Sequence, residues 1–393
     1  MPSQYDVLII GGFGHVGLPL GIVLADAGFQ VGLLDLNTAL RPTIEKGVMP
    51  FIEHGAEPIM KRVIGKNLHV CDGIADVAKA KTIIITIGTP VDEYLSPVIK
   101  PLFTLADTLL PHLTKDHCLV LRSTVYPGTT RALLEHFRKN GKDVHLSNCP
   151  ERIVQGFAIQ ELKELPQVIS GCTPEAVTMA GNLFQKLGVE TIEVGVEEAE
   201  CTKLFLNAWR YMQFAAANQF YTFATERGLD YAKIHHAMTH HYKRGNIPKP
   251  GFAAGPCLFK DTMQLAAADR SHFPLGHAAM IVNEGLPSFL VEQLERGGED
   301  LRGKTVGILG MAFKSDIDDT RDSLSFKLRK LLQFKGAEVL CSDEFVKDKS
   351  FVLKEELLKK CSIVIVGVPH SVYKGAKVPA KTKIVDLWGV LSS

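Results

Sequence analysis

Residues 6–35 read DVLIIGGFGHVGLPLGIVLADAGFQVGLLD. The short run at 6–10, which is continuously apolar from Val7 to Ile10, is typical of a strand in a parallel sheet that helices cover on both faces. A glycine-rich turn follows, and the sequence then predicts a helix over 18–27 and a second strand over 30–34 that ends at Asp35. Strand, glycine turn, helix and strand within about 30 residues predict a βαβ unit.

The turn itself has the spacing of a dinucleotide-binding motif, with Gly12, Gly14 and Gly17 separated by one and then two residues. In such a turn the first glycine permits the tight bend, the second lets a pyrophosphate approach the backbone, and the third allows close packing of helix on strand. The helix N-terminus adds free N–H groups and a positive dipole end. Asp35 would accept hydrogen bonds from a ribose diol and repel a 2′-phosphate. These residues predict NAD rather than NADP, with a glycine turn in a protein that binds no nucleotide as the alternative.

Strands and helices continue to alternate through the first half of the chain. Further strand candidates are 81–87, 117–121, 144–147, 167–170 and 190–194, with helical stretches such as 101–113 and 129–139 between them. Repeated β-α-β-α order over about 195 residues predicts one doubly wound parallel sheet.

A helical segment follows. The stretch 197–227 contains neither Pro nor Gly and predicts one long helix. Apolar residues at helical spacing form one face of it, namely Leu206, Trp209, Met212, Ala216, Phe220 and Phe223. Beyond a Pro/Gly-rich loop at 245–256, another helix is predicted over about 277–294.

The strand pattern returns at 304–309, after glycines at 297, 298 and 303. Further strands are predicted at 338–341, 362–366 and 383–387. The predicted fold is therefore α/β, with two Rossmann-like, doubly wound parallel-sheet domains at 1–196 and 298–393. A helical central domain with a long helix, at 197–297, joins them.

Composition excludes several classes of function. The 44 Lys and Arg nearly balance the 43 Asp and Glu, which leaves no basic excess to neutralise nucleic-acid phosphates. No apolar run reaches the ~18 residues of a membrane span, and the N-terminal residues do not resemble a secretory signal. Eight scattered cysteines without a C-x-x-C pair are typical of a reducing compartment. We expect a cytoplasmic protein that binds neither nucleic acid nor membrane.

Two groups of residues suggest chemistry. Cys257 follows the flexible loop and precedes Lys260 and Asp261, which suits a thiolate nucleophile because nearby cations lower a thiol pKa. An inert buried cysteine is the alternative. Lys203 and Asn207 lie four residues apart, on one face of the long helix, and both can donate to a developing oxyanion. A solvated helix face is the alternative there.

The histidines at 236 and 240 have helical i, i+4 spacing, which invites a metal interpretation. Neither a cysteine nor a cluster of carboxylates completes a ligand set in the sequence around them. The sequence therefore predicts no metal site.

Further ordered motifs extend over nearly the whole chain. They are Gly12–Gly17 with Asp35, Gly88-Thr89-Pro90, Arg122–Thr130, Pro150-Glu151-Arg152, Glu200 with Lys203 and Asn207, Gly255-Pro256-Cys257 with Lys260-Asp261, Leu309–Lys314, and Asp319–Ser323. Together they resemble the UDP-glucose/GDP-mannose dehydrogenase family of NAD-dependent nucleotide-sugar 6-dehydrogenases.

The resemblance implies catalytic roles in the middle of the chain. Cys257 would be the nucleophile, Lys203 and Asn207 would steady oxyanions, and Asp261 would assist proton transfer and water near the thiol. Glu151 would hold water from the first domain.

The resemblance also implies binding roles. The hydroxyl of Thr124 would help the Glu151 carboxylate to position water. Thr89 and Thr124 would also contact NAD. The implied contacts to the nucleotide sugar are Glu151, Arg152, Lys203, Asn207, Arg244, Lys314 and Arg321. Of these, Arg244 would reach the substrate across a dimer interface.

The family implies a four-electron reaction. The C6 hydroxyl of a UDP-sugar is oxidised to a uronic acid with two NAD in turn, through a thiohemiacetal and a thioester on the cysteine. NAD would bind the first domain and UDP the last, with the reacting carbon at the central helices. The family also implies polysaccharide biosynthesis and a homodimer or higher homo-oligomer formed through the long helix.

The sugar is predicted from three local features that resemble the N-acetylhexosamine branch. They are Pro150–Ile153, Asn207-x-x-Arg210 with Ala217-Asn218, and Asn283–Pro287. An acetamido group needs room and polar partners, and Arg152 or Arg210 could donate to its carbonyl. The segment Phe259–Thr262 instead resembles the UDP-glucose branch, which makes UDP-glucose the alternative substrate.

Two other classes of protein remain as alternatives. A β-hydroxyacid dehydrogenase of the 6-phosphogluconate type also joins a Rossmann domain to helices, but it needs neither the cysteine nor a third α/β domain. A nucleotide-sugar-binding protein without catalysis would have no need of Cys257 and Lys203, which are both present.

Overall fold

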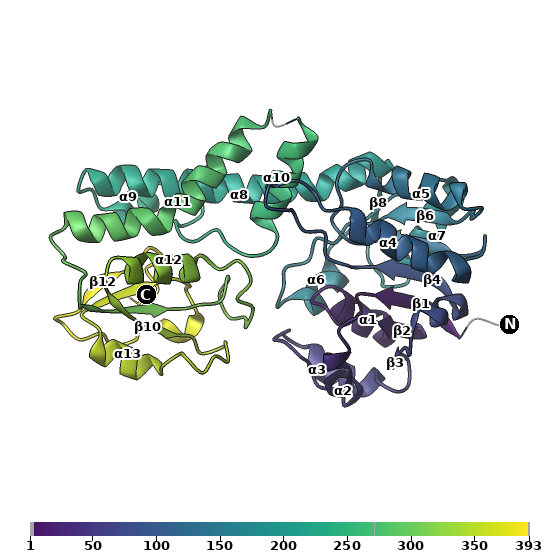
Figure 1. Cartoon of the computed structure of the whole chain (residues 1–393), viewed down its shortest axis with the longest axis horizontal. Helices are drawn as coiled ribbons and strands as arrows, with labels where there is room; N and C mark the ends of the chain where they lie inside the picture. Colours follow the sequence, from purple (N-terminus) through teal and green to yellow (C-terminus); the bar gives the residue numbers. More distant parts are fainter. Residues whose placement is uncertain (1–3, 271, 392–393) are drawn as a thin grey trace. The chain divides into compact units, whose positions relative to one another are not determined.

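The chain forms two compact units, one ending at Leu206 and the other beginning at Asn207. The computed structural model describes residues 4–270 and 272–391, and Figure 1 shows their helices and strands. None of the helices in this described part is long and apolar enough to cross a membrane.

The first unit is built on a six-stranded parallel sheet in the order β3-β2-β1-β4-β5-β6. The strands are β1 (Tyr5–Ile10), β2 (Val31–Leu34), β3 (Leu68–Val70), β4 (Ala80–Ile85), β5 (Cys118–Leu121) and β6 (His145–Asn148). The order reverses between β1 and β4, as in a doubly wound Rossmann sheet, where ligands bind at the carboxyl ends of the strands. Ile10 pairs with both Leu34 and Ile85, so these three strands end at the same edge.

Helices cover both faces of this sheet (Figure 1). One face carries α1 (Gly17–Asp26), α3 (Ala56–Val63), α6 (Ala158–Glu164) and α7 (Pro174–Gln185), and the other carries α4 (Lys100–Leu109) and α5 (Thr129–Lys139). Side chains alternate along β1, so Val7 and Ile9 join the first core and Leu8 and Ile10 the second. The uninterrupted apolar run of β1 follows from this double burial. The short helix α2 (Arg41–Glu45) precedes α3, and 3₁₀ turns lie at Thr38–Leu40, Ile74–Lys79 and Leu110–His112.

The prediction of one continuous sheet in this unit was wrong. Strands β7 (Gln167–Ile169) and β8 (Thr191–Glu193) pair with each other in a separate two-stranded parallel sheet. Single hydrogen bonds replace a ladder beside β6: the N–H of Cys172 donates to Leu146 O (2.8 Å) and the hydroxyl of Ser170 to Asn148 O (2.6 Å). Strand β3 was not predicted, because its three residues, one of them histidine, form no apolar run.

The predicted long helix is confirmed as α8 (Val196–Glu226). It continues across the residues where the two units divide. The helices α9 (Tyr231–Thr239), α10 (Leu258–Ala268) and α11 (Pro274–Arg296) follow it in the second unit. Residues 240–257, between α9 and α10, form an irregular connection that leads into Cys257.

The end of the second unit is a four-stranded parallel sheet in the order β10-β9-β11-β12. Its strands are β9 (Thr305–Leu309), β10 (Glu338–Ser342), β11 (Ile363–Val366) and β12 (Lys383–Val385), with helices α12 (Leu324–Phe334) and α13 (Lys354–Lys360) and a 3₁₀ turn at Ser371–Tyr373. The order reverses between β9 and β11, which makes this a second Rossmann-like sheet. Leucines of α11 and α12 share its core, so the central helices and the sheet pack within one unit.

Candidate functional site

The glycine turn of the first unit is tied directly to Asp35. The N–H of Phe13 donates to Asp35 Oδ2 at 3.0 Å, and the N–H of Asn37 donates to Oδ1 at 2.9 Å. The structure therefore brings the predicted ribose-binding acid to the predicted pyrophosphate-binding turn, at the carboxyl ends of β1 and β2. Asp35 is only partly exposed, and both of its carboxylate oxygens are held by backbone N–H groups.

The steric surroundings of the three glycines differ. A Cβ at Gly17 would lie 2.2 Å from Gly11 O, and a Cβ at Gly12 would lie 2.9 Å from Ile9 O, so packing excludes a side chain at both. A Cβ at Gly14 would meet its nearest neighbour, Gly11 O, at an ordinary 3.6 Å. The protein itself does not demand glycine at this position, whereas a pyrophosphate approaching the backbone does. The turn therefore fits NAD.

The loops that follow β4 and β5 are joined to each other. The hydroxyl of Thr89 donates to the carbonyl of Thr124, and the hydroxyl of Ser123 donates to Ile87 O at 2.7 Å. The two threonines expected to contact NAD thus lie together, beyond the carboxyl ends of neighbouring strands.

Glu151 is part of a buried ion pair that sequence reasoning missed. Arg122 and Glu151 are 1% and 6% exposed, and the guanidinium contacts the carboxylate directly. Arg122 also donates to Gln167 Oε1 at 3.1 Å. The other carboxylate oxygen of Glu151 accepts the N–H groups of Arg152 (2.8 Å) and Ile153 (3.1 Å). The side chain of Arg152 donates to the carbonyl of Pro166, which uses part of its capacity within the protein.

Glu200, one turn before Lys203 on α8, caps helix α5. Its carboxylate accepts the N–H groups of Gly128 (2.6 Å) and Thr130 (2.8 Å) and the hydroxyl of Thr130 (2.5 Å). Burial raises the pKa of Glu200 despite these hydrogen bonds. The residue fixes the end of the loop that carries Thr124. Lys203 is partly buried.

The second unit places Cys257 at the N-terminal end of α10 and Asp261 one turn further along the same helix. Asp261 is 1% exposed, and its Oδ2 accepts the amide of Asn207 at 2.5 Å. Its Oδ1 is 2.8 Å from Lys260 Nζ. The predicted amide and carboxylate therefore form one buried, charge-compensated group. Cys257 is exposed, and a helix N-terminus favours the thiolate.

Arg321 lies within electrostatic range of that cysteine. Its guanidinium forms a fork with the Asp319 carboxylate, at 3.0 Å from Nε and 2.6 Å from Nη2. These hydrogen bonds raise the pKa of Arg321, and negative charge on Cys257 and Asp322 adds to the effect. Lys314 lies in the same loop between β9 and α12, partly exposed. The structure thus brings Arg321 toward Cys257, on a loop that also carries Lys314.

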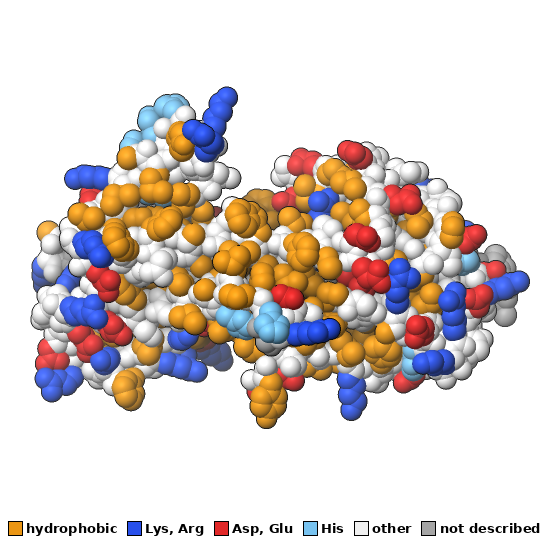
Figure 2. All heavy atoms as spheres, turned by 90° about the horizontal axis from the view of Figure 1, so that it is seen from above, with side chains coloured by type: hydrophobic (Ala, Val, Ile, Leu, Met, Phe, Trp, Pro, Cys, Tyr) orange, Lys and Arg blue, Asp and Glu red, His pale blue; other side chains and the backbone are white. Residues whose placement is uncertain are grey.

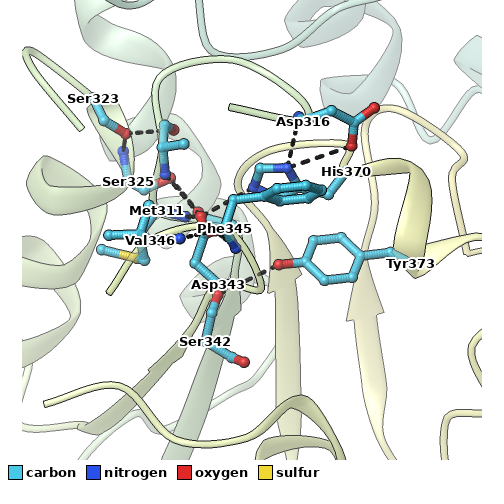
Figure 3. Close-up of polar contacts among 12 residues, drawn as sticks. Met311, Asp316, Ser323, Ser325, Ser342, Asp343, Phe345, Val346, His370 and Tyr373 are labelled. Atoms are coloured by element: carbon cyan, nitrogen blue, oxygen red, sulfur yellow. Dashed lines mark hydrogen bonds and ion pairs between the residues drawn. The ribbon is translucent and has the colours of Figure 1, made fainter. Parts of the chain in front are cut away.

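A buried pair, Asp343 and His370, holds the start of this loop (Figure 3). Asp343 Oδ2 accepts the N–H groups of Met311 (2.7 Å) and Ala312 (2.9 Å). The Nδ1 of His370 accepts the N–H of Asp316 at 2.9 Å, so Nε2 carries the proton and donates to Asp343 at 3.0 Å. Burial opposes ionisation of Asp343, but the hydrogen bonds from His370 and the backbone outweigh it and lower its pKa.

Asp343 was missed, although the sequence holds a signal for it. Asp343 directly follows β10, just as Asp35 directly follows β2. Asp35 accepts an N–H group from the turn after β1, and Asp343 accepts N–H groups from the turn after β9. An acid directly after the second strand of a βαβ unit is therefore the pattern that could have found it. Its partner His370 has no such local signal.

Arg244 and the histidines at 236 and 240, which the sequence singled out, contact other residues than the groups above. Arg244 is exposed after α9, where its guanidinium lies 5.3 Å from the ring centre of Tyr242. It lines a shallow pocket of about 370 Å³ with Met238 and Ile247. The rings of His236 and His240 lie 4.5 Å apart, and the described residues contain no cluster of three potential metal ligands.

Comparisons with known proteins match nearly the whole chain. Models of the UDP-glucose/GDP-mannose dehydrogenase family match residues 6–188 (NAD binding domain), 197–285 (central domain) and 307–393 (UDP binding domain). A UDP-N-acetyl-D-mannosamine dehydrogenase of Pyrococcus horikoshii is 29% identical over 379 residues, which are 92% of this chain and 89% of the relative. An NDP-N-acetyl-D-galactosaminuronic acid dehydrogenase of Ralstonia nicotianae is 24% identical, over 94% of this chain and 92% of its own.

Solved structures agree. The structure of the UDP-D-ManNAc dehydrogenase from Pyrococcus horikoshii matches 97% of this chain and 94% of its own, with a TM-score of 0.89 and 25% identity. A UDP-glucose dehydrogenase from Pyrobaculum islandicum shares the fold with the same TM-score, at 24% identity over 98% of this chain and 94% of its own. Since the matched segments span nearly all of the sequence, the chain belongs to the UDP-glucose/GDP-mannose dehydrogenase family of NAD-dependent nucleotide-sugar dehydrogenases.

Proposed function

We propose that this chain oxidises the C6 hydroxyl of a UDP-N-acetylhexosamine to the carboxylate, with Cys257 as the nucleophile. The observation that carries the proposal is the exposed cysteine at the start of α10, with the buried Asp261–Asn207 pair one turn behind it. A dehydrogenase that stopped at the aldehyde would not need a thiol there. A cysteine that holds the aldehyde covalently lets the same site reach the acid.

The chain's own residues divide the work as follows. The Cys257 thiolate adds to the aldehyde carbon to give a thiohemiacetal, and water later hydrolyses the thioester and returns the thiol. Asn207 donates to the oxyanion that develops at this carbon, and Asp261 holds that amide in place. Lys203, one turn earlier on α8, adds a positive charge to the same role. Bound NAD supplies the hydride acceptor for both oxidations.

Binding of the two nucleotides is assigned to the two Rossmann-like sheets. The glycine turn, Asp35, Thr89 and Thr124 would hold NAD. Lys314 and Arg321 would bind the UDP-sugar, because they lie on the loop at the carboxyl end of β9, where such sheets bind ligands. Glu151 with Arg152, and Arg244 from a second subunit, remain proposed contacts to water or sugar.

The preference for an N-acetylated sugar is supported by the relatives named above, which include a UDP-N-acetyl-D-mannosamine dehydrogenase. Two sequence features that favoured this sugar have other contacts in the structure. Asn218 and Asn283 bond to each other and to backbone groups, and Arg210 is exposed. We propose Arg152 as the donor to the acetamido carbonyl, because its guanidinium is partly buried and uses only part of its donor capacity on Pro166 O.

A panel of sugars tests the substrate. We expect kcat/KM for a UDP-N-acetylhexosamine to exceed that for UDP-glucose by roughly ten- to a hundredfold, since a polar group left unpaired costs about 1–3 kcal/mol. NADH absorbance would be followed side by side for UDP-glucose and for the gluco, galacto and manno N-acetylhexosamines. Preference for UDP-glucose would overturn the sugar assignment and leave the four-electron mechanism standing.

Cofactor choice tests the first site. Asp35→Ala is expected to raise the NADP-to-NAD ratio of kcat/KM by about tenfold or more, because the carboxylate both binds the ribose diol and repels a 2′-phosphate. The matched control is Asp72→Ala, which removes an exposed acid shortly after the neighbouring strand β3. Equal use of both cofactors by the unaltered enzyme would show that Asp35 does not face the ribose.

We further propose a homodimer or higher homo-oligomer formed through α8, in a cytoplasmic protein with domains at 1–196, 197–297 and 298–393. Large apolar side chains on α8 support it, since Trp209, Phe220 and Phe223 are 57%, 46% and 54% exposed. Hydrophobic side chains also gather on the face seen in Figure 2. Patches of this kind mark interaction surfaces in soluble proteins.

A further inference from the structure

Two buried amides join the central helices to the loop that leads into Cys257. Asn218 of α8 and Asn283 of α11 are both 0% exposed. Asn218 Oδ1 accepts the N–H of Gly251 at 2.8 Å, and its Nδ2 donates to Gly251 O at 3.0 Å. The amide therefore pairs with both backbone groups of one loop residue, as a neighbouring strand would.

Asn283 fixes the orientation of that amide. Asn218 Nδ2 also donates to Asn283 Oδ1 at 2.9 Å, and Asn283 Nδ2 donates to Tyr211 O at 3.0 Å. A flipped Asn218 would present its oxygen to two acceptors, Asn283 Oδ1 and Gly251 O, so only one orientation satisfies the group. Buried networks that are fully satisfied in this way hold a single conformation.

The loop residue that Asn218 holds cannot carry a side chain. A Cβ at Gly251 would lie 2.0 Å from the Trp388 ring, and Lys249 Nζ donates to Trp388 O at 2.7 Å. Gly251 is therefore packed between the Asn218 amide on one side and the Trp388 indole on the other. Residues 240–257 contain no helix or strand that could otherwise define its course.

A second anchor lies two residues before the cysteine. The N–H of Gly255 donates to Asp322 O at 3.3 Å, and Gly255 has a φ of +98°. A Cβ there would lie 2.5 Å from the ring of Phe313. This anchor connects the cysteine loop to the loop that carries Arg321. The segment that leads into Cys257 is thus attached at Gly251 and at Gly255, and loss of the attachment at Gly251 would loosen it.

We propose that Asn218, oriented by Asn283, is a positioning residue for Cys257. It acts through Gly251 and contacts neither substrate nor cofactor itself. The inference rests on the proposed function, since it concerns the loop of the proposed nucleophile. If the pair positions Cys257, its variants lower the kcat of the folded enzyme. If the pair is purely structural, its variants lower only the amount of folded protein.

The test compares Asn218→Asp with the unaltered enzyme and with Leu290→Ala. The carboxylate keeps the acceptor for Gly251 N–H but turns repulsive toward Gly251 O and Asn283 Oδ1. Leu290 lies on the same helix as Asn283, in the core and 2% exposed, so its truncation lowers stability without removing the amide pair. Asn218→Ser, which keeps one short polar group, serves if the aspartate variant does not fold.

For the folded variants at Asn218 we expect kcat to fall about a hundredfold, because misplacing a reacting group by an ångström costs on that order. KM for NAD should stay within about threefold of the unaltered value, since the change lies outside the cofactor turn. Leu290→Ala should lower the melting temperature and leave kcat of the folded enzyme unchanged. A kcat at Asn218 equal to that of Leu290→Ala would overturn the proposal.

A second readout does not depend on turnover. Iodoacetamide labels Cys257, the exposed cysteine, and the labelled peptide is quantified by mass spectrometry across pH. We expect the midpoint of labelling to rise by about one pH unit in Asn218→Ser, which adds no charge of its own, as the displaced thiolate loses part of the Arg321 field. An unchanged midpoint would contradict positioning. The labelling result stands even if no UDP-sugar proves to be oxidised, so failure of the proposed function is told apart from failure of this inference.

Discussion

Cys257→Ser is expected to lower the rate of acid formation by roughly a thousandfold or more while NAD and UDP-sugar still bind. The structure gives the reason, since Cys257 is the N-cap residue of α10 and interacts with the charge of Arg321, and both a helix N-terminus and a nearby cation favour a thiolate. A serine hydroxyl at the same place stays protonated. The measurement is acid produced per enzyme per second, with binding of both ligands followed by calorimetry.

Cys172→Ser is the matched control for this variant. Cys172 is partly buried, and burial raises the pKa of its thiol, so it should be chemically inert. Its replacement should leave acid formation unchanged. Turnover of Cys257→Ser at the rate of the unaltered enzyme would remove the cysteine from the mechanism.

Arg122→Met is expected to lower the free energy of unfolding by about 3–5 kcal/mol, the usual cost of leaving a buried charge without its partner. Arg122 is 1% exposed, contacts Glu151 and Gln167, and has its guanidinium 4.8 Å from the ring centre of Phe184. Methionine fills a similar volume, so the loss reports the charge rather than a cavity. Urea denaturation at neutral pH measures it.

The exposed pair between Arg131 and Glu197 supplies the comparison. These side chains are 58% and 49% exposed, and Arg131→Met should change stability by only about 0.5 kcal/mol or less. Equal losses of unfolding free energy for the two arginine variants would show that the buried ion pair contributes no more to stability than the exposed one.

The parts of the fold that could be predicted are those whose signal is local. The turn from Gly12 to Gly17 and the acid at Asp35 lie within one βαβ unit, and the structure brings them together by a single hydrogen bond. The long helix α8 was predicted because Pro and Gly are absent from it. Cys257 and Asp261 lie one helical turn apart at the start of α10, where the N–H of Asp261 donates to Cys257 O.

The parts that were missed depend on partners distant in sequence. Asp343 meets His370, 27 residues away, and Asn218 meets Asn283, 65 residues away. Neither separation leaves a periodic signal, because such pairs are set by how whole elements pack. The split between β6 and β7 was missed for a similar reason: whether two strands complete a ladder depends on their register and not on their composition.

The yield of NADH per sugar is the most direct test of the four-electron mechanism. A limiting amount of UDP-N-acetylhexosamine would be oxidised to completion with excess NAD, and NADH would be measured by absorbance alongside the acid formed. The account predicts two NADH and one carboxylate for each sugar consumed. One NADH per sugar, with an aldehyde or ketone as the product, would contradict it.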